Sequence, residues 1–128
     1  MRLAADGAIT MGLSILDLFK IGVGPSSSHT VGPMVAANRF IAELEQRQQL
    51  PQTAEVRIEL YGSLAMTGEG HATDTAIILG LMGEQPEQLD PNQAPELIKQ
   101  VRTTGELNLA KQHSVPFHEP RHLLFLHG

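Results

Sequence analysis

The polar and apolar residues of this chain recur with a helical period in some stretches and alternate in others. Residues 31–49 carry an apolar residue at every third or fourth position, which predicts a helix with one apolar stripe. That stripe consists of Met34, Ala37, Ile41 and Leu44. If Thr30 caps this helix, Pro33 lies in the first turn, where the missing N–H of proline costs nothing.

Residues 54–62 alternate strictly between apolar and polar positions, and this period predicts a half-buried strand. The two faces of the strand consist of Val56, Ile58 and Leu60 on one side and Glu55, Arg57 and Glu59 on the other. A loop punctuated by glycines follows over residues 62–70. The dense apolar run Ala76–Met82 then predicts a buried helix that ends near Gly83.

The C-terminal part is predicted to combine a loop, a helix and short strands. Residues 83–95 contain three prolines and are expected to form a surface loop. A helix is predicted over residues 95–105, with Gly105 as its C-terminal stop. The apolar face of that helix consists of Leu97, Ile98 and Val101. After Glu106, short strands are expected at residues 107–109, 115–117 and 123–126.

The N-terminal residues give weaker patterns. Organised sequence begins after Met11, so we expect residues 1–10 to be an extension outside the fold. Ser14 can cap a short helix from Ile15 to about Lys20. Together these elements predict one domain of the α/β class, a two-layer α+β fold in which helices pack on one small mixed sheet.

The composition of the 128 residues fits a domain with a real core. Hydrophobic residues make up 41% of the chain, with four Phe, one Tyr and no Trp, so the core is expected to be aliphatic. The chain contains no cysteine, and it therefore cannot by itself form a disulfide, a zinc–thiolate site or an iron–sulfur site with cysteine ligands.

The charge and hydropathy of the chain argue against two classes of partner. The net charge is −5 and no cluster of Lys or Arg is present, which argues against nucleic acid and against a polybasic membrane anchor. The longest apolar run is too short to cross a bilayer. The N-terminus lacks the apolar segment of a signal peptide, so we expect a cytoplasmic protein.

The first motif with candidate chemistry is GPSSSHT at residues 24–30, directly before the helix predicted from residue 31. It contains Ser26, Ser27, Ser28, His29 and Thr30. Hydroxyls and backbone N–H groups near a helix N-terminus can bind a carboxylate or phosphate, and they also suit an amino acid or hydroxy acid. The alternative is an ordinary helix cap with solvated serines, because capping needs only one of these residues.

The second motif is GEGHATD at residues 68–74, before the buried helix. Its glycines let the backbone approach a ligand closely. The helix dipole disfavours a protonated His71, and a neutral imidazole near pH 7 is what a general base requires. Asp74 could orient the ring or favour the helix start. The alternative is a glycine turn, a cap and a packed histidine. Neither glycine loop fits a Walker loop or a G-x-G-x-x-G fingerprint.

Four further histidines lie near the C-terminus, at positions 113, 118, 122 and 127. Metal binding by them is conceivable, but the spacing of strand residues places them on two faces. Ordinary surface or strand histidines are therefore the favoured interpretation.

The stretches DLFKIGVGPSSSHTVGPM at 17–34 and LYGSLAMTGEGHATDTAIILGL at 60–81 resemble the N-terminal (beta) domain of iron–sulfur L-serine dehydratases. The resemblance is closest to the single-chain bacterial type and covers nearly all of residues 11–128. It implies conversion of L-serine to pyruvate and ammonia through an aminoacrylate. It also implies a [4Fe–4S] cluster as Lewis acid, without pyridoxal phosphate.

The resemblance also implies partners and a division of labour. The cluster cysteines of the family lie in a C-terminal catalytic domain, so we expect this cysteine-free chain to be a fragment that binds no cluster and is inactive alone. We expect His71 to be the base and His29 to orient the substrate or share the proton relay. The residues expected to bind L-serine are Ser26, Ser27, Ser28, Thr30, Gly70, Thr73 and Asp74. The full enzyme is expected to be a homodimer.

Two features leave other roles open. The domain type also resembles the allosteric substrate-binding domain of some phosphoglycerate dehydrogenases, which implies a regulatory domain that binds serine or a small anion without catalysis. A purely structural role in dimerisation is a further alternative. In addition, the dehydratase family commonly has Lys at the position of Glu69, and we expect Glu69 to lie outside the site.

Overall fold

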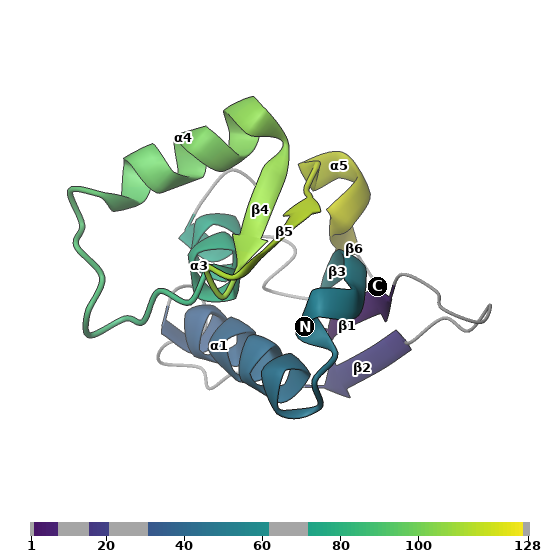
Figure 1. The fold of residues 1–128 in the computed structure, drawn as a ribbon. Helices are drawn as coiled ribbons and strands as arrows, with labels where there is room; N and C mark the ends of the chain where they lie inside the picture. The colour runs from purple at the N-terminus through teal and green to yellow at the C-terminus, as the bar shows by residue number, and fades with distance from the viewer. Residues whose placement is uncertain (1, 8–15, 21–30, 62–71, 127–128) are drawn as a thin grey trace.

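The computed structural model of the chain describes residues 2–7, 16–20, 31–61 and 72–126. Its main sheet has four strands in the order β2-β1-β3-β6 (Figure 1). The strands are β1 (Arg2–Gly7), β2 (Leu16–Lys20), β3 (Thr53–Tyr61) and β6 (Leu123–Leu126). β1 runs antiparallel to both β2 and β3, whereas β6 runs parallel to β3. The sheet is therefore mixed, as predicted.

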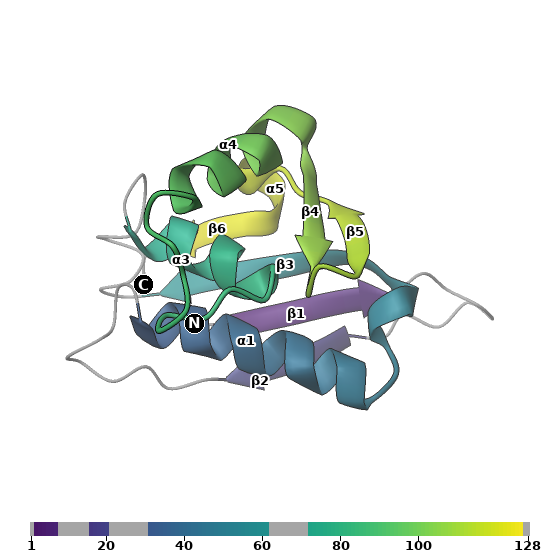
Figure 2. The ribbon, with the colours of Figure 1, turned by 60° about the vertical axis from the view of Figure 1, so that its left-hand side comes forward.

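The helices lie on one face of this sheet, which confirms the predicted two-layer α+β fold (Figure 2). They are α1 (Val31–Gln46), α3 (Ala72–Leu81), α4 (Ala94–Thr104) and the single turn α5 (Glu119–His122), with a 3-10 turn η2 (Leu50–Gln52) before β3. α1, α3 and α4 match the predicted helices, and Gly105 ends α4 in the left-handed region at φ 70°. Within the described ranges no helix is long and apolar enough to span a membrane.

α1 and α3 pack directly against each other because α3 carries a glycine at the contact. A Cβ at Gly80 would lie 2.6 Å from the carbonyl oxygen of Met34 and 2.7 Å from the Cβ of Ala37. Asn38 then bridges the two elements, since its Nδ2 donates to the carbonyls of Gly80 and Glu84, both at 2.9 Å. The end of α3 is thus fixed to α1.

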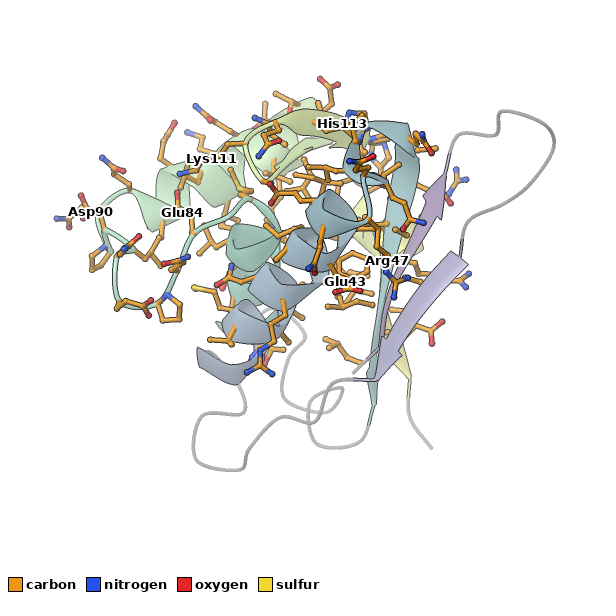
Figure 3. The ribbon with its side chains drawn as sticks, turned by 60° about the horizontal axis from the view of Figure 1, so that its bottom comes forward. Glu43, Arg47, Glu84, Asp90, Lys111 and His113 are labelled. Carbon is orange, nitrogen blue, oxygen red and sulfur yellow. The ribbon has the colours of Figure 1, made fainter. Side chains whose placement is uncertain are left out.

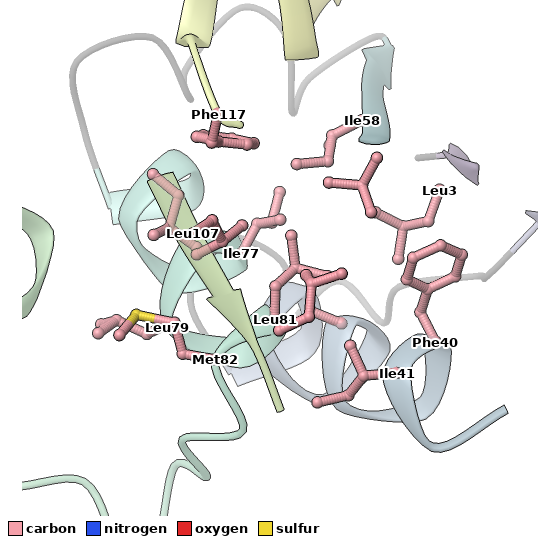
Figure 4. Close-up of a cluster of buried hydrophobic side chains, with 14 of the residues drawn as sticks. Leu3, Phe40, Ile41, Ile58, Ile77, Leu79, Leu81, Met82, Leu107 and Phe117 are labelled. Atoms are coloured by element: carbon pink, nitrogen blue, oxygen red, sulfur yellow. The ribbon is translucent and has the colours of Figure 1, made fainter. Parts of the chain in front are cut away.

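The core lies between these two helices and the sheet and is aliphatic, as the composition predicted. Figure 4 shows Phe40 and Ile41 of α1 facing Ile77 and Leu81 of α3, with Leu3 nearby. The apolar face of β3 is buried, with Val56, Ile58 and Leu60 at most 1% exposed. The strict alternation of the sequence predicted this face.

A second, two-stranded sheet consists of β4 (Glu106–Leu109) and β5 (His113–Pro116). Its turn places Ala110 and Lys111 at positive φ. The turn is joined to the end of α3, because the N–H of Ala110 donates to the carbonyl of Leu81 at 2.9 Å. Lys111 Nζ also lies 3.1 Å from Glu84 Oε1 (Figure 3). The sequence predicted these short strands, but it predicted one sheet rather than two.

Two predictions for the N-terminal residues are wrong. Residues 1–10 were expected to lie outside the fold, yet Arg2–Gly7 form β1 in the interior of the sheet, with Leu3 1% exposed. A helix was expected up to Lys20, yet Leu16–Lys20 form the strand β2. Both segments are too short to show a decisive period, and each is held by pairing with strands elsewhere in the chain.

Candidate functional site

The topology brings the chain out of the sheet at the same edge before both polar motifs. Arg2, at the start of β1, lies opposite Lys20 in β2 and opposite Glu59 in β3. β2 and β3 therefore end at the same edge of the sheet, one on each side of β1. The segment that contains the first motif follows β2, and the segment that contains the second follows β3. α1 begins at this edge as well (Figure 2).

Of the predicted site residues, Thr73 and Asp74 belong to the described part of the chain, in the first turn of α3. The others, namely Ser26, Ser27, Ser28, His29, Thr30, Gly70 and His71, lie outside the described residues. The roles of all of them stay predictions. Thr73 and Asp74 lie at the start of the buried helix, as the sequence indicated.

Thr73 carries a buried hydroxyl that lacks a partner. The residue is 0% exposed, and its Oγ1 accepts and donates no hydrogen bond within the described ranges. An unsatisfied buried hydroxyl costs about 1–3 kcal/mol, and few buried polar atoms in proteins are left in this state. The hydroxyl is therefore available to a polar group from outside the described residues.

Asp74 is a buried carboxylate with partners on two elements. Its Oδ1 accepts the N–H of Thr75 at 2.8 Å, and its Oδ2 lies 3.4 Å from Nη2 of Arg102 in α4. The side chain is only 3% exposed. Burial raises the pKa of Asp74 above its ordinary value, although the bond from Thr75 and the charge of Arg102 act in the opposite direction.

Arg102 connects Asp74 to a third element. Its Nε donates to Oε1 of Glu119, the first residue of α5, at 2.7 Å. The row Asp74–Arg102–Glu119 therefore joins the start of α3 to α4 and α5. No pattern in the sequence indicates a role for Arg102 or Glu119, because a cation in the last turn of a helix is ordinary and nothing local indicates a distant partner.

The C-terminal histidines within the described ranges are engaged in the fold. His122 is 2% exposed, and its Nδ1 accepts the backbone N–H of His118 at 2.9 Å. Its Nε2 lies 3.6 Å from Glu55 Oε2. His113 Nε2 lies 2.6 Å from the carbonyl oxygen of Thr53. Across the described residues no group of three or more His, Cys, Asp or Glu side chains is arranged to hold a metal ion.

Comparison with known proteins identifies relatives for most of the chain. The family described as "Serine dehydratase beta chain" matches residues 14–128. The chain is 46% identical over 107 residues to an L-serine dehydratase of Streptomyces coelicolor, covering 84% of this chain and 24% of that protein. It is 50% identical over 106 residues to L-serine dehydratase 2 of Escherichia coli, covering 82% of this chain and 23% of that protein.

A third relative gives the same picture. An L-serine dehydratase of Haemophilus influenzae is 46% identical over 114 residues, covering 88% of this chain and 25% of that protein. The chain thus spans about a quarter of the length of the curated relatives it matches.

Proposed function

Because this chain belongs to the serine dehydratase beta chain family, as its two motifs predicted, we propose that it supplies part of the active site of an L-serine ammonia-lyase. The enzyme removes the α-proton and the β-hydroxyl of L-serine, and the aminoacrylate decays to pyruvate and ammonia. The observation that carries the proposal is the shared sheet edge: β2 and β3 end at the same edge on either side of β1, and each is followed along the chain by one of the motifs.

The chain's own residues do not fit a [4Fe–4S] cluster. It has no cysteine, and the described residues contain no group of metal ligands. As the family resemblance implies, the cluster of the full enzyme would be held by the cysteines of its C-terminal iron–sulfur domain. L-serine and that domain are the proposed partners of this chain, in a cytoplasmic homodimer.

The chain contributes a base and groups that hold the substrate. His71 directly precedes α3 and accepts the α-proton on a neutral imidazole. His29 orients the substrate or takes part in the proton relay. The serine carboxylate and hydroxyl are held by hydroxyls of the first motif, with Ser26, Ser27, Ser28 and Thr30 as candidates.

Gly70, Thr73 and Asp74 complete the proposed substrate contacts, and Thr73 has the clearest support. Its buried hydroxyl has no partner among the described residues, and a substrate polar group would satisfy it. Besides its proposed contact with the substrate, Asp74 interacts with Arg102, and this pair fixes the start of the helix that His71 precedes.

His71→Ala in the enzyme formed with the iron–sulfur domain tests the base. We expect kcat to fall by about 10²–10⁴-fold, because a positioned base contributes that factor. His118→Ala is the matched control, since His118 is exposed and is distant in sequence from both motifs. Near-normal turnover of the His71 variant, measured as pyruvate release, would exclude it as the base.

A regulatory domain that binds serine or a small anion is the competing function. Calorimetry of the 128-residue chain with L-serine distinguishes the two. A shared active site leaves half of the contacts on another domain, so we expect little heat at millimolar L-serine. Clear saturation in that range would favour the regulatory function.

A further inference from the structure

We propose that the groove between α3, α4 and the loop that joins them binds a small amphipathic carboxylic acid. This α3–α4 groove has a volume of about 660 Å³. Pockets that bind small molecules are concave, mostly apolar and roughly 300–1,000 Å³ in volume, with a few polar groups that orient the ligand. The proposal does not depend on the dehydratase function.

The apolar part of the α3–α4 groove comes from all three of its walls. Leu79 lines it from α3, Leu89 and Pro91 from the joining loop, and Ile98 from α4. Leu79 and Ile98 are also members of the core, so the α3 and α4 walls are anchored by core packing. A branched or aromatic hydrocarbon group that fills this part is stabilised by the removal of apolar surface from water.

α4 provides the polar part of the groove from the same face as its apolar residues. Its first residue, Ala94, lines the groove, and so do Pro95, Ile98, Lys99, Arg102 and Thr103. From Pro95 on, they follow the spacing i, i+3, i+4, i+7 and i+8, which is one face of a helix. Along this face the apolar residues come first, and Arg102 and Thr103 come last. A ligand is therefore oriented with its hydrocarbon part toward the start of α4 and its charged group toward the end.

Lys99 is the cation of this polar part that attracts an anion, because Arg102 is already paired with Asp74 and Glu119. Lys99 is exposed and forms no ion pair within the described ranges. Arg102 uses Nε for Glu119 and Nη2 for Asp74, which leaves Nη1 without a partner in the described part of the chain. A carboxylate can accept hydrogen bonds from both side chains. The dipole at the end of α4 weakly opposes an anion, and the charge of Lys99 together with Nη1 of Arg102 acts against it.

Titration of the ¹⁵N-labelled 128-residue chain with 4-methylpentanoate, followed by amide NMR, tests the proposal. We expect saturable shifts at residues that line the groove, such as Thr75, Leu89 and Thr103, with a dissociation constant of about 0.1–10 mM. The uncharged 4-methylpentanamide is the matched ligand. We expect it to bind about three- to tenfold more weakly, because it lacks the charge-assisted hydrogen bonds.

Lys99→Met should weaken the binding of 4-methylpentanoate by about three- to tenfold and leave the binding of 4-methylpentanamide unchanged. Arg39→Met, which removes an exposed cation from α1, is the control and should change neither. Equal binding of acid and amide, or no saturable shift up to about 20 mM, would overturn the proposal. So would groove shifts that depend on protein concentration, because the groove would then be a contact between chains.

Discussion

The two ends of α3 are held in different ways. At its end, Gly80 lets the backbone of α3 touch that of α1, and Asn38 adds two neutral hydrogen bonds of 2.9 Å. At its start, Asp74 is held by Arg102 at 3.4 Å, and Arg102 is itself 46% exposed. The C-terminal end of α3 is therefore held by close packing, and its N-terminal end is held by an ion pair that is partly exposed to solvent.

This difference has a consequence for the second motif, which directly precedes the start of α3. Close packing is insensitive to pH and salt, whereas an ion pair that includes a buried carboxylate responds to both. Changes in solution conditions should therefore affect the helix start that follows His71 before they affect the contact between α1 and α3.

The largest expected effect comes from Gly80→Ala. A Cβ at this position would lie 2.6 Å from a backbone oxygen of α1, so the two helices have to move apart. We expect a loss of about 2–3 kcal/mol in the free energy of unfolding, even though alanine is the better helix former. Urea unfolding followed by circular dichroism measures this loss. A variant as stable as the parent would show that the close approach is not needed.

A smaller effect is expected for Arg102→Met, which leaves the buried Asp74 carboxylate without its cation. We expect a loss of about 1–2 kcal/mol at pH 7, less than for a fully buried pair because Arg102 is partly exposed. Arg121→Met is the control, since Arg121 is 72% exposed in its pair with Glu55 and should contribute under about 0.5 kcal/mol. Equal losses of stability for the two variants would show that the pair between Arg102 and the buried Asp74 contributes no more than an exposed ion pair.

The smallest effect is the pH dependence contributed by Asp74. Burial raises the pKa of this carboxyl in the folded chain, so the unfolded chain loses the proton first as pH rises. The contribution of Asp74 to stability is therefore fully present below the ordinary Asp pKa and is lost as pH rises through the folded pKa. Asp74→Asn removes this titration. We expect the stability of the parent chain relative to Asp74→Asn to fall across that range, as measured by urea unfolding at several pH values.

The sequence predicted those parts of the fold that have a long regular period or a dense apolar run. α1 and α4 each follow a helical period over at least ten residues, β3 alternates over nine, and α3 was predicted from its dense apolar run. β1 and β2 were missed because five or six residues fit either period, and their identity as strands depends on pairing with each other and with β3. For the site, the start of α3 was predicted, but the ion pair of Asp74 was not.

The sequence by itself determined the helices and strand with a buried face, the aliphatic core and the family, because each of these is written in the order of neighbouring residues. Only the tertiary structure decided that Arg2–Gly7 lie inside the sheet and that Arg102 is the partner of Asp74. The physical reason is the same for both. Strand pairing and ion pairing join residues that are distant in sequence, and no local pattern carries information about a distant partner.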